Sequence, residues 1–200
     1  MTRRKAYHHG DLRKALVEAG LSMIEELGSE GLSLRKIAAR VGVSHAAPEH
    51  HFSTLRHLLT ALAAEGFRGF RQSMLTAMQA SPGGPAEQLR AALEGYLAFA
   101  RLQPHLFRLM FDKTRLDWED PVLGEAGQAA RDVLSDICRP AVVRLGLDTP
   151  AGRLSVEHLV WSYAHGYAHL FIDKKIESDS ERIGVPVTTP LDLARLLVPD

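Results

Sequence analysis

The segment from Leu32 to Phe52 constrains this chain more than any other part of it. Its sequence, LSLRKIAARVGVSHAAPEHHF, has the spacing of a short helix, a glycine turn and a second short helix. Ser33 is placed to cap the first helix, Gly42 to turn the chain, and Ser44 to cap a second helix that starts at His45. This spacing is typical of a helix-turn-helix, whose second helix enters a DNA groove.

Charge is distributed unevenly along the 200 residues, which are enough to bury a full core. The formal net charge is zero, and this alone argues against nucleic-acid binding. Residues 1–60, however, carry nine Lys or Arg against six Asp or Glu, together with six of the ten histidines. We therefore predict a basic head with an N-terminal arm, residues 1–56, followed by a larger body, residues 57–200.

The cysteine content and hydropathy of the chain indicate its setting. The single cysteine, Cys138, excludes a disulfide framework and a clustered thiolate metal site. The sequence shows no signal-peptide pattern and no apolar run long enough to span a bilayer. We expect a soluble, cytoplasmic protein without a membrane partner.

Apolar residues recur at helical spacing through most of the chain, and no segment has the alternation of a half-buried strand. A first helix is expected from Asp11 to Leu27, ended by Gly28, and a long helix from Leu55 to about Ala80, ended by the SPGGP break. The remaining helices are expected at 86–102, 104–110, 122–145, 153–175 and from Pro190 onward, with 177–189 as a loop. The prediction is an all-α fold, with a three-helix head and a larger helical bundle.

Four short motifs near the N-terminus carry a family resemblance. YHHGDLRKAL at 7–16, LSLR at 32–35, VSHAAP at 43–48 and HF at 51–52 resemble, in order and spacing, the N-terminal region of TetR-type transcriptional regulators. WSYAHG at 161–166 resembles the Trp-His-Gly (WHG) signature of one C-terminal subclass of that family. The resemblance implies a homodimer with two DNA-reading heads, bodies that pair through their last two long helices, and a small-molecule cavity in each body.

In such a head the second short helix reads base edges while flanking residues hold phosphates. The base-edge candidates are His45, Ala46 and Ala47. The phosphate candidates are Ser33, Arg35, Lys36, Ser44 and His51, with the arm residues Arg3, Arg4 and Lys5. Capping alone also explains the two serines, and a solvated helix face also explains Arg35 and Lys36.

Two positions depart from the family pattern. Glu49 stands where relatives usually have a phosphate-binding tyrosine, and Leu55 where they usually have a lysine. Both changes remove a phosphate contact, which predicts weaker binding with a flatter salt dependence. Alternatively, Glu49 accepts a hydrogen bond from cytosine N4 and adds sequence preference. We also hypothesise that Glu49, beside His50 and His51, makes DNA affinity pH-sensitive, because protonated imidazoles would offset the carboxylate.

The candidates for a ligand cavity in the body are apolar side chains and one imidazole, since such pockets are mostly apolar with a few orienting polar groups. They are Phe99, Phe107, Met110, Phe111, Trp118, Trp161 and His165. Ordinary core packing is the simpler explanation for any one of them.

Three histidines, His158, His165 and His169, share one helix face, as the ligands of a metal site would. No carboxylate or thiolate at ligand spacing accompanies them, so core or interface histidines are favoured. We predict no metal and no cofactor.

The leading hypothesis is a ligand-responsive DNA-binding transcriptional regulator, a repressor that a small molecule releases from its operator, with the signal passing along the helix from Leu55. Its partners would be a double-stranded operator, a second copy of the chain and a small-molecule effector. The alternative is a helical ligand-binding or scaffold dimer whose DNA-binding head is degenerate. An enzyme is disfavoured because the sequence has no G-x-S-x-G elbow, phosphate-cradling glycine loop or H-E-x-x-H motif.

Overall fold

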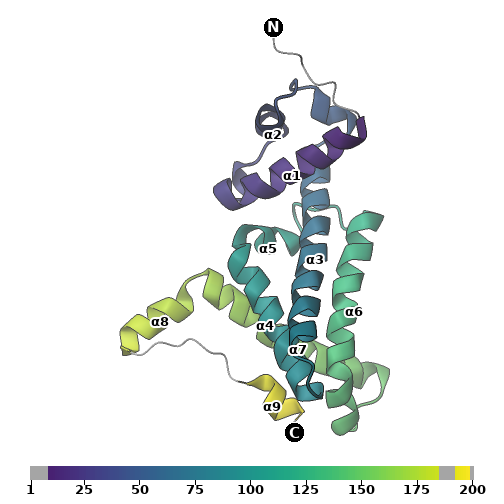
Figure 1. The fold of residues 1–200 in the computed structure, drawn as a ribbon, viewed down its shortest axis with the longest axis vertical. Coiled ribbons are helices and arrows are strands. Elements are labelled where there is room, and N and C mark those ends of the chain that lie inside the picture. The colour runs from purple at the N-terminus through teal and green to yellow at the C-terminus, as the bar shows by residue number, and fades with distance from the viewer. Residues whose placement is uncertain (1–8, 185–191, 199–200) are drawn as a thin grey trace. The chain divides into compact units, whose positions relative to one another are not determined.

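Helices joined by turns make up the chain in a computed structural model that describes residues 9–184 and 192–198 (Figure 1). No strand occurs among these residues, and the all-α prediction with a helix-turn-helix head and a helical C-terminal part is confirmed. No helix within the same ranges has the length and apolar character that a membrane span requires.

The chain packs as two compact units. Unit 1 contains the described residues up to Gly66 together with His105–Ala126, and unit 2 contains Phe67–Pro104 and the described residues from Gly127 onward. The elements of unit 1 are α1 (His9–Leu27), η1 (Ser29–Gly31), α2 (Leu34–Val41), η2 (Ala47–His50), the start of α3 (Leu55–Ala80) and α5 (Pro104–Met110). Unit 2 holds the rest of α3, α4 (Pro85–Leu102), most of α6 (Pro121–Arg144), α7 (Pro150–Ile172), α8 (Lys175–Ile183) and α9 (Leu193–Leu197). The functional division between 1–56 and 57–200 stays a prediction.

Local signals in the head produce the expected first half of the helix-turn-helix. The Ser33 side chain accepts a hydrogen bond from the Lys36 amide at 3.2 Å and so caps α2. Gly42 ends α2 in the left-handed conformation with φ 78°, and the Val43 amide donates to the Ala38 carbonyl at 3.0 Å. This is the bonding of a glycine helix stop, which satisfies carbonyls that the helix itself leaves open.

The predicted second helix from His45 is wrong: the structure has a single turn of 3₁₀-helix, η2, over Ala47–His50. An α-helix capped by Ser44 would need residue 48 to donate an amide hydrogen to the Ser44 carbonyl, and Pro48 has none. The Ala47 amide donates to that carbonyl instead, at 3.0 Å, which closes a tighter turn. Ser44 therefore does not cap η2, whose N-cap is Ala46 without a side-chain bond.

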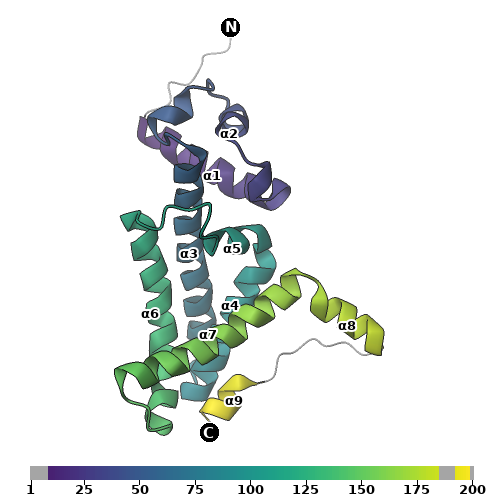
Figure 2. The same ribbon diagram turned by 180° about the vertical axis from the view of Figure 1, so that it is seen from behind.

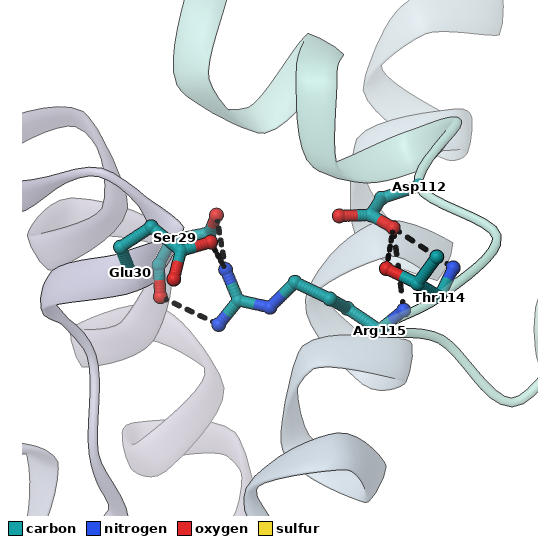
Figure 3. A network of polar contacts seen from close by, with 5 residues as sticks. All are labelled: Ser29, Glu30, Asp112, Thr114 and Arg115. Atoms are coloured by element: carbon teal, nitrogen blue, oxygen red, sulfur yellow. Dashed lines mark hydrogen bonds and ion pairs between the residues drawn. The ribbon is translucent and has the colours of Figure 1, made fainter.

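A loop from the middle of the sequence is fixed to η1 within unit 1 (Figure 3). The Arg115 guanidinium donates to the Ser29 hydroxyl at 2.7 Å and to the Ser29 carbonyl at 3.0 Å, and it also pairs with Glu30. Asp112 orders the loop, because its carboxylate accepts from the Thr114 amide at 2.8 Å, the Thr114 hydroxyl at 2.6 Å and the Arg115 amide at 3.3 Å. Figure 3 shows Arg115 reaching from this loop to the two head residues.

Further bonds attach the same stretch to α1 and α3. The Glu25 carboxylate accepts from the Leu106 amide at 2.9 Å, close to the start of α5. Arg56 donates to the Leu116 carbonyl at 2.6 Å, and the Thr60 hydroxyl accepts from the Asp117 amide at 3.0 Å. Residues 105–126 thus belong to the same packing unit as the N-terminal helices.

The core of unit 2 forms where α4, α6, α7 and α9 meet. In this unit α4 contacts both α7 and α9 (Figures 1 and 2). The buried residues of this cluster include Leu89, Ala92, Ile137, Cys138, Ala141, Val156, Val160 and Ala194. One buried charge, Glu157, is paired: Arg131 donates to it at 3.3 Å and the Ser135 hydroxyl at 2.9 Å. Burial, and then the charge of Glu157, raise the pKa of Cys138 to about 12, so its thiol is unreactive at neutral pH.

The expected helix over 153–175 and the loop over 177–189 are both corrected. Helix α7 ends at Ile172, Lys174 adopts a left-handed conformation with φ 56°, and α8 follows at an angle, as Figure 2 shows. Its sequence, KIESDSERI, has only two apolar residues, Ile176 and Ile183, which are too few to predict a helix from apolar spacing. Pro190, the expected start of the last helix, lies outside the described residues.

Helices α3 and α4 approach closely at Gly95 in unit 2. A Cβ atom added at Gly95 would lie 2.6 Å from the Ser73 carbonyl oxygen and 2.7 Å from the Met74 Cα. The Ser73 hydroxyl also donates to the Gly95 carbonyl at 2.8 Å, which draws the two backbones together. Only glycine fits this crossing without movement of a backbone.

We expect Gly95→Ala to lower the free energy of unfolding by about 1–3 kcal/mol, because the methyl group would force two packed helices apart. Denaturation in urea, followed by circular dichroism, measures the change. The matched control is Gly127→Ala in α6, where an added Cβ would meet no atom within 4 Å; we expect it to raise stability by about 0.5–1 kcal/mol. Equal stabilities of the two variants would show that the crossing is not tight.

Candidate nucleic-acid interface and ligand site

Most of the predicted base-reading residues lie on the surface of the turn after α2. Pro48 and Phe52 are buried and anchor this turn to unit 1. The exposed candidates are Ser44, His45, Ala46, Glu49 and His50, while Ala47 and His51 are half-buried. The arm candidates Arg3, Arg4 and Lys5 lie outside the described residues.

The phosphate candidates on α2 differ in their surroundings. Arg35 and Lys36 are both exposed, and the Lys36 ammonium donates to the Gly31 carbonyl at 2.7 Å. The Ser33 hydroxyl caps α2, which agrees with the capping interpretation of the sequence. The neighbouring Arg40 binds both oxygens of Glu26 at 3.0 and 2.7 Å and thereby joins α2 to α1. This hydrogen bonding holds the pKa of Glu26 below its usual value.

Glu49, His50 and His51 are brought together at a polar pocket of about 350 Å³ in unit 1. Arg13 and Asp120 line the same pocket. The Arg13 guanidinium lies 5.1 Å from the centre of the Phe52 ring, close enough for a cation–π contact. The carboxylate and imidazoles that the pH hypothesis requires therefore line one pocket.

The seven ligand-cavity candidates fall in both units. Phe107, Met110, Phe111 and Trp118 belong to unit 1, and Phe99, Trp161 and His165 belong to unit 2. Phe99, Phe107 and Met110 are buried, Trp118 is 43% exposed, and the remaining three are half-buried. Their role in ligand binding stays a prediction.

Trp161 and His165 converge on Tyr96 of α4, a partner that the sequence did not indicate. The Tyr96 hydroxyl lies 2.8 Å from His165 Nδ1 and is also hydrogen-bonded by Trp161. The indole N–H is only a donor, so Tyr96 accepts from Trp161, and we assign its own hydroxyl hydrogen to His165 Nδ1. The two residues of the WHG resemblance thus join α7 to α4 through one tyrosine.

This arrangement requires a neutral His165. Burial, and then the charge of His169, lower the pKa of His165 to about 4, and burial raises the pKa of Tyr96. The His165 and His169 rings lie 4.7 Å apart, edge to face. Within the described part of the chain, no three His, Cys, Asp or Glu side chains lie together as metal ligands would.

A second pocket, of about 380 Å³, lies at the α7–α8 turn of unit 2 and includes Arg101, Phe171 and Lys174. None of these residues was a candidate, because a helix running through Lys175 leaves no turn there to shape a pocket. The left-handed conformation of Lys174 has no sequence signal, since glycine and asparagine are the usual residues for it.

We expect the neutral state of His165 to make stability depend on pH. A histidine whose pKa is about 4 when folded and about 6.5 when unfolded stabilises the fold fully above pH 6.5 and progressively less toward pH 4. Lowering the pH from 7 to 5 should therefore reduce the free energy of unfolding of the wild-type protein by up to about 2 kcal/mol more than that of the His165→Asn variant. Urea denaturation at both pH values measures this, with His158→Asn, at an exposed position of the same helix, as the control. The same pH response in both variants would contradict the assignment.

Comparisons with known proteins agree with this fold. Residues 89–183 match the family described as Tetracyclin repressor-like, C-terminal domain. The HTH-type transcriptional regulator BetI of Escherichia coli is 31% identical over 115 residues, which cover 48% of this chain and 59% of that protein. The match thus spans less than two thirds of the length of the curated relative.

Two solved structures extend the similarity over most of the chain. A protein of unknown function from Rhodococcus sp. RHA1 is 28% identical with a TM-score of 0.70, covering 92% of this chain and 100% of that one. The TetR family transcriptional regulator PfmR from Thermus thermophilus is 21% identical with a TM-score of 0.57, covering 78% of this chain and 85% of that one. Over residues 89–183 the chain is therefore similar to Tetracyclin repressor-like C-terminal domains, and over most of its length it shares the fold of a TetR-family regulator.

Proposed function

We propose that this chain is a TetR-type transcriptional regulator that binds operator DNA as a homodimer. One observation carries the proposal: residues 44–46, 49 and 50 are presented to solvent on a turn that Ser33-capped α2 and left-handed Gly42 hold in place. This is the position from which a helix-turn-helix contacts base edges. The similarity of residues 89–183 to a Tetracyclin repressor-like domain supports the same function.

The short turn defines how such a head would bind. A full recognition helix offers side chains from successive turns, whereas η2 has four residues, one of them the buried Pro48. His45, Ala46 and Ala47 would meet the bases, and Arg35, Lys36, His51 and the residue 3–5 arm would meet phosphates. Fewer base contacts than usual shift the affinity toward its electrostatic, salt-dependent part.

Repression with release by a small molecule is the regulatory mode that we propose. A ligand in the body around Phe99, Trp161 and His165 would favour one of two head spacings, and a changed spacing would no longer fit successive major-groove half-sites. Helix α3, which runs from unit 2 into unit 1, would carry the change. The WHG subclass, the cytoplasmic location and the absence of catalysis belong to the same proposal.

A second candidate function is a helical ligand-binding or scaffold dimer with a degenerate head. It is favoured by the exposed Glu49 carboxylate and by the replacement of the second helix by η2. The two functions differ in whether sequence-specific DNA binding survives at physiological salt.

Capture of genomic fragments by the purified protein, followed by sequencing, should recover a palindromic site. We expect this site to be bound at physiological salt at least about a thousandfold more tightly than a scrambled duplex of the same length. Fluorescence anisotropy at several salt concentrations measures both affinities and the salt slope. Equal affinities for the two duplexes would reject the regulator and favour the degenerate head.

Glu49→Gln should strengthen operator binding several-fold at pH 8, because removing a carboxylate beside the phosphates removes a repulsion of about 1 kcal/mol. The pH hypothesis predicts that the wild-type protein binds more tightly at pH 6 than at pH 8. Glu181→Gln, an exposed carboxylate on α8, is the control and should change neither affinity. Weaker binding of Glu49→Gln would indicate that the carboxylate reads cytosine, and equal wild-type affinity at both pH values at constant salt would reject the pH hypothesis.

A further inference from the structure

The pocket at the α7–α8 turn combines an apolar wall with a cationic rim. It has a volume of about 380 Å³ and lies entirely in unit 2. Ala100 of α4 is buried beneath it, and Phe171 and Ile172 of α7 form its apolar side. Its charged residues are Arg101, Lys174 and Glu177. A volume of this size accommodates a small organic molecule.

Arg101 is held at this pocket by an aromatic contact. Its guanidinium carbon lies 4.6 Å from the centre of the Phe171 ring, in cation–π geometry. A guanidinium carries five N–H donors, so Arg101 keeps donors for hydrogen bonds to a ligand beside this contact. Within the described residues, Arg101 forms no ion pair or hydrogen bond with another side chain.

Lys174 reaches the pocket through an unfavourable backbone conformation. Among the described residues it is the one non-glycine with a positive φ, 56°. A left-handed conformation costs such a residue about 1–2 kcal/mol, and residues held in this way concentrate at ligand sites and switches. The Lys174 amide donates to the Phe171 carbonyl at 3.0 Å, and this bond closes the turn between α7 and α8.

The charges and the apolar wall of the pocket indicate the chemical class of its ligand. Two cations face one carboxylate, and neither Arg101 nor Lys174 is ion-paired with Glu177 in the part of the chain that the structure describes. An organic cation is disfavoured because Arg101 already occupies the face of Phe171. An anion without apolar groups would leave the apolar wall uncovered. A carboxylate attached to an apolar chain or ring satisfies both the rim and the wall.

We propose that this pocket binds a small amphipathic carboxylate, with Arg101 and Lys174 on the carboxylate and Phe171 and Ile172 against the apolar part. The binding site stands on its own observations. Its role as an effector site, as an alternative to the region around Phe99, Trp161 and His165, rests on the regulatory function proposed above.

Isothermal titration calorimetry with octanoate and 4-phenylbutyrate as probes tests the site in the full-length protein. We expect saturable binding of at least one probe, and much weaker binding of octylammonium and octan-1-ol, which share the chain but lack the carboxylate. Arg101→Gln should weaken binding at least about tenfold, since it removes a charge-assisted contact. Lys174→Asn, which removes the charge but keeps a residue that tolerates the left-handed turn, should weaken it in the same direction.

Lys175→Gln is the matched control, because it removes a neighbouring exposed cation that does not line the pocket. We expect it to bind the probes as the unmodified protein does. Absence of saturable binding by both carboxylates, equal binding of octanoate and octan-1-ol, or unchanged affinity in Arg101→Gln would overturn the proposal.

A separate titration of captured operator DNA distinguishes the two proposals. Lower operator affinity in the presence of the bound probe, lost in Arg101→Gln, would establish the effector role. Probe binding without any effect on DNA would leave the site intact and reject that role. Absence of specific DNA binding by the ligand-free protein would reject the proposed regulatory function. It would leave the proposed ligand site untouched, because the calorimetry measures probe binding without DNA.

Discussion

The Arg115 contact with Ser29 and Glu30 is the interaction on which the organisation of unit 1 depends. It joins residues 85 or 86 positions apart in the chain, and the Arg115 side chain is only 20% exposed. Hydrogen bonds from a charged group contribute about 1.5–3 kcal/mol each, more than exposed ion pairs. Asp112 holds the loop in shape, while Glu25, Arg56 and Thr60 fix its flanks to α1 and α3. Residues 105–126, from the middle of the chain, therefore belong to the same packing unit as the N-terminal helices.

Local chemistry explains which parts of this fold were predictable. Ser33 before an apolar-periodic run, Gly42 after it and the SPGGP break each act through neighbouring backbone atoms, so the sequence identifies them directly. The all-α class follows from the same periodicity. The helix at residues 175–183 was missed because two apolar residues in nine are too few to indicate one. Arg115 was missed because nothing in its own neighbourhood indicates a partner in η1.

The candidate site, too, was predictable from the sequence only in part. The exposed positions after α2 followed from motif spacing, but the helix expected to carry them did not form, since one missing amide hydrogen at Pro48 outweighed good helix formers around it. Trp161 and His165 were chosen for aromatic and polar character, yet their hydrogen bonds go to Tyr96 on another helix. The pocket at Lys174 depends on a backbone conformation that residue type disfavours, so no sequence pattern points to it.

Pro48 has a consequence for the thermodynamics of recognition. Many DNA-binding segments gain helix on contact with the duplex, and the ordering entropy and heat-capacity change of that folding are part of their binding free energy. A proline lacks its amide hydrogen in the complex as in the free protein, so the turn over Ala47–His50 cannot lengthen into an α-helix from His45. In the proposed DNA-binding function, the surface over residues 44–50 would therefore be preformed, and the adjustment of shape on binding would fall mainly to the DNA.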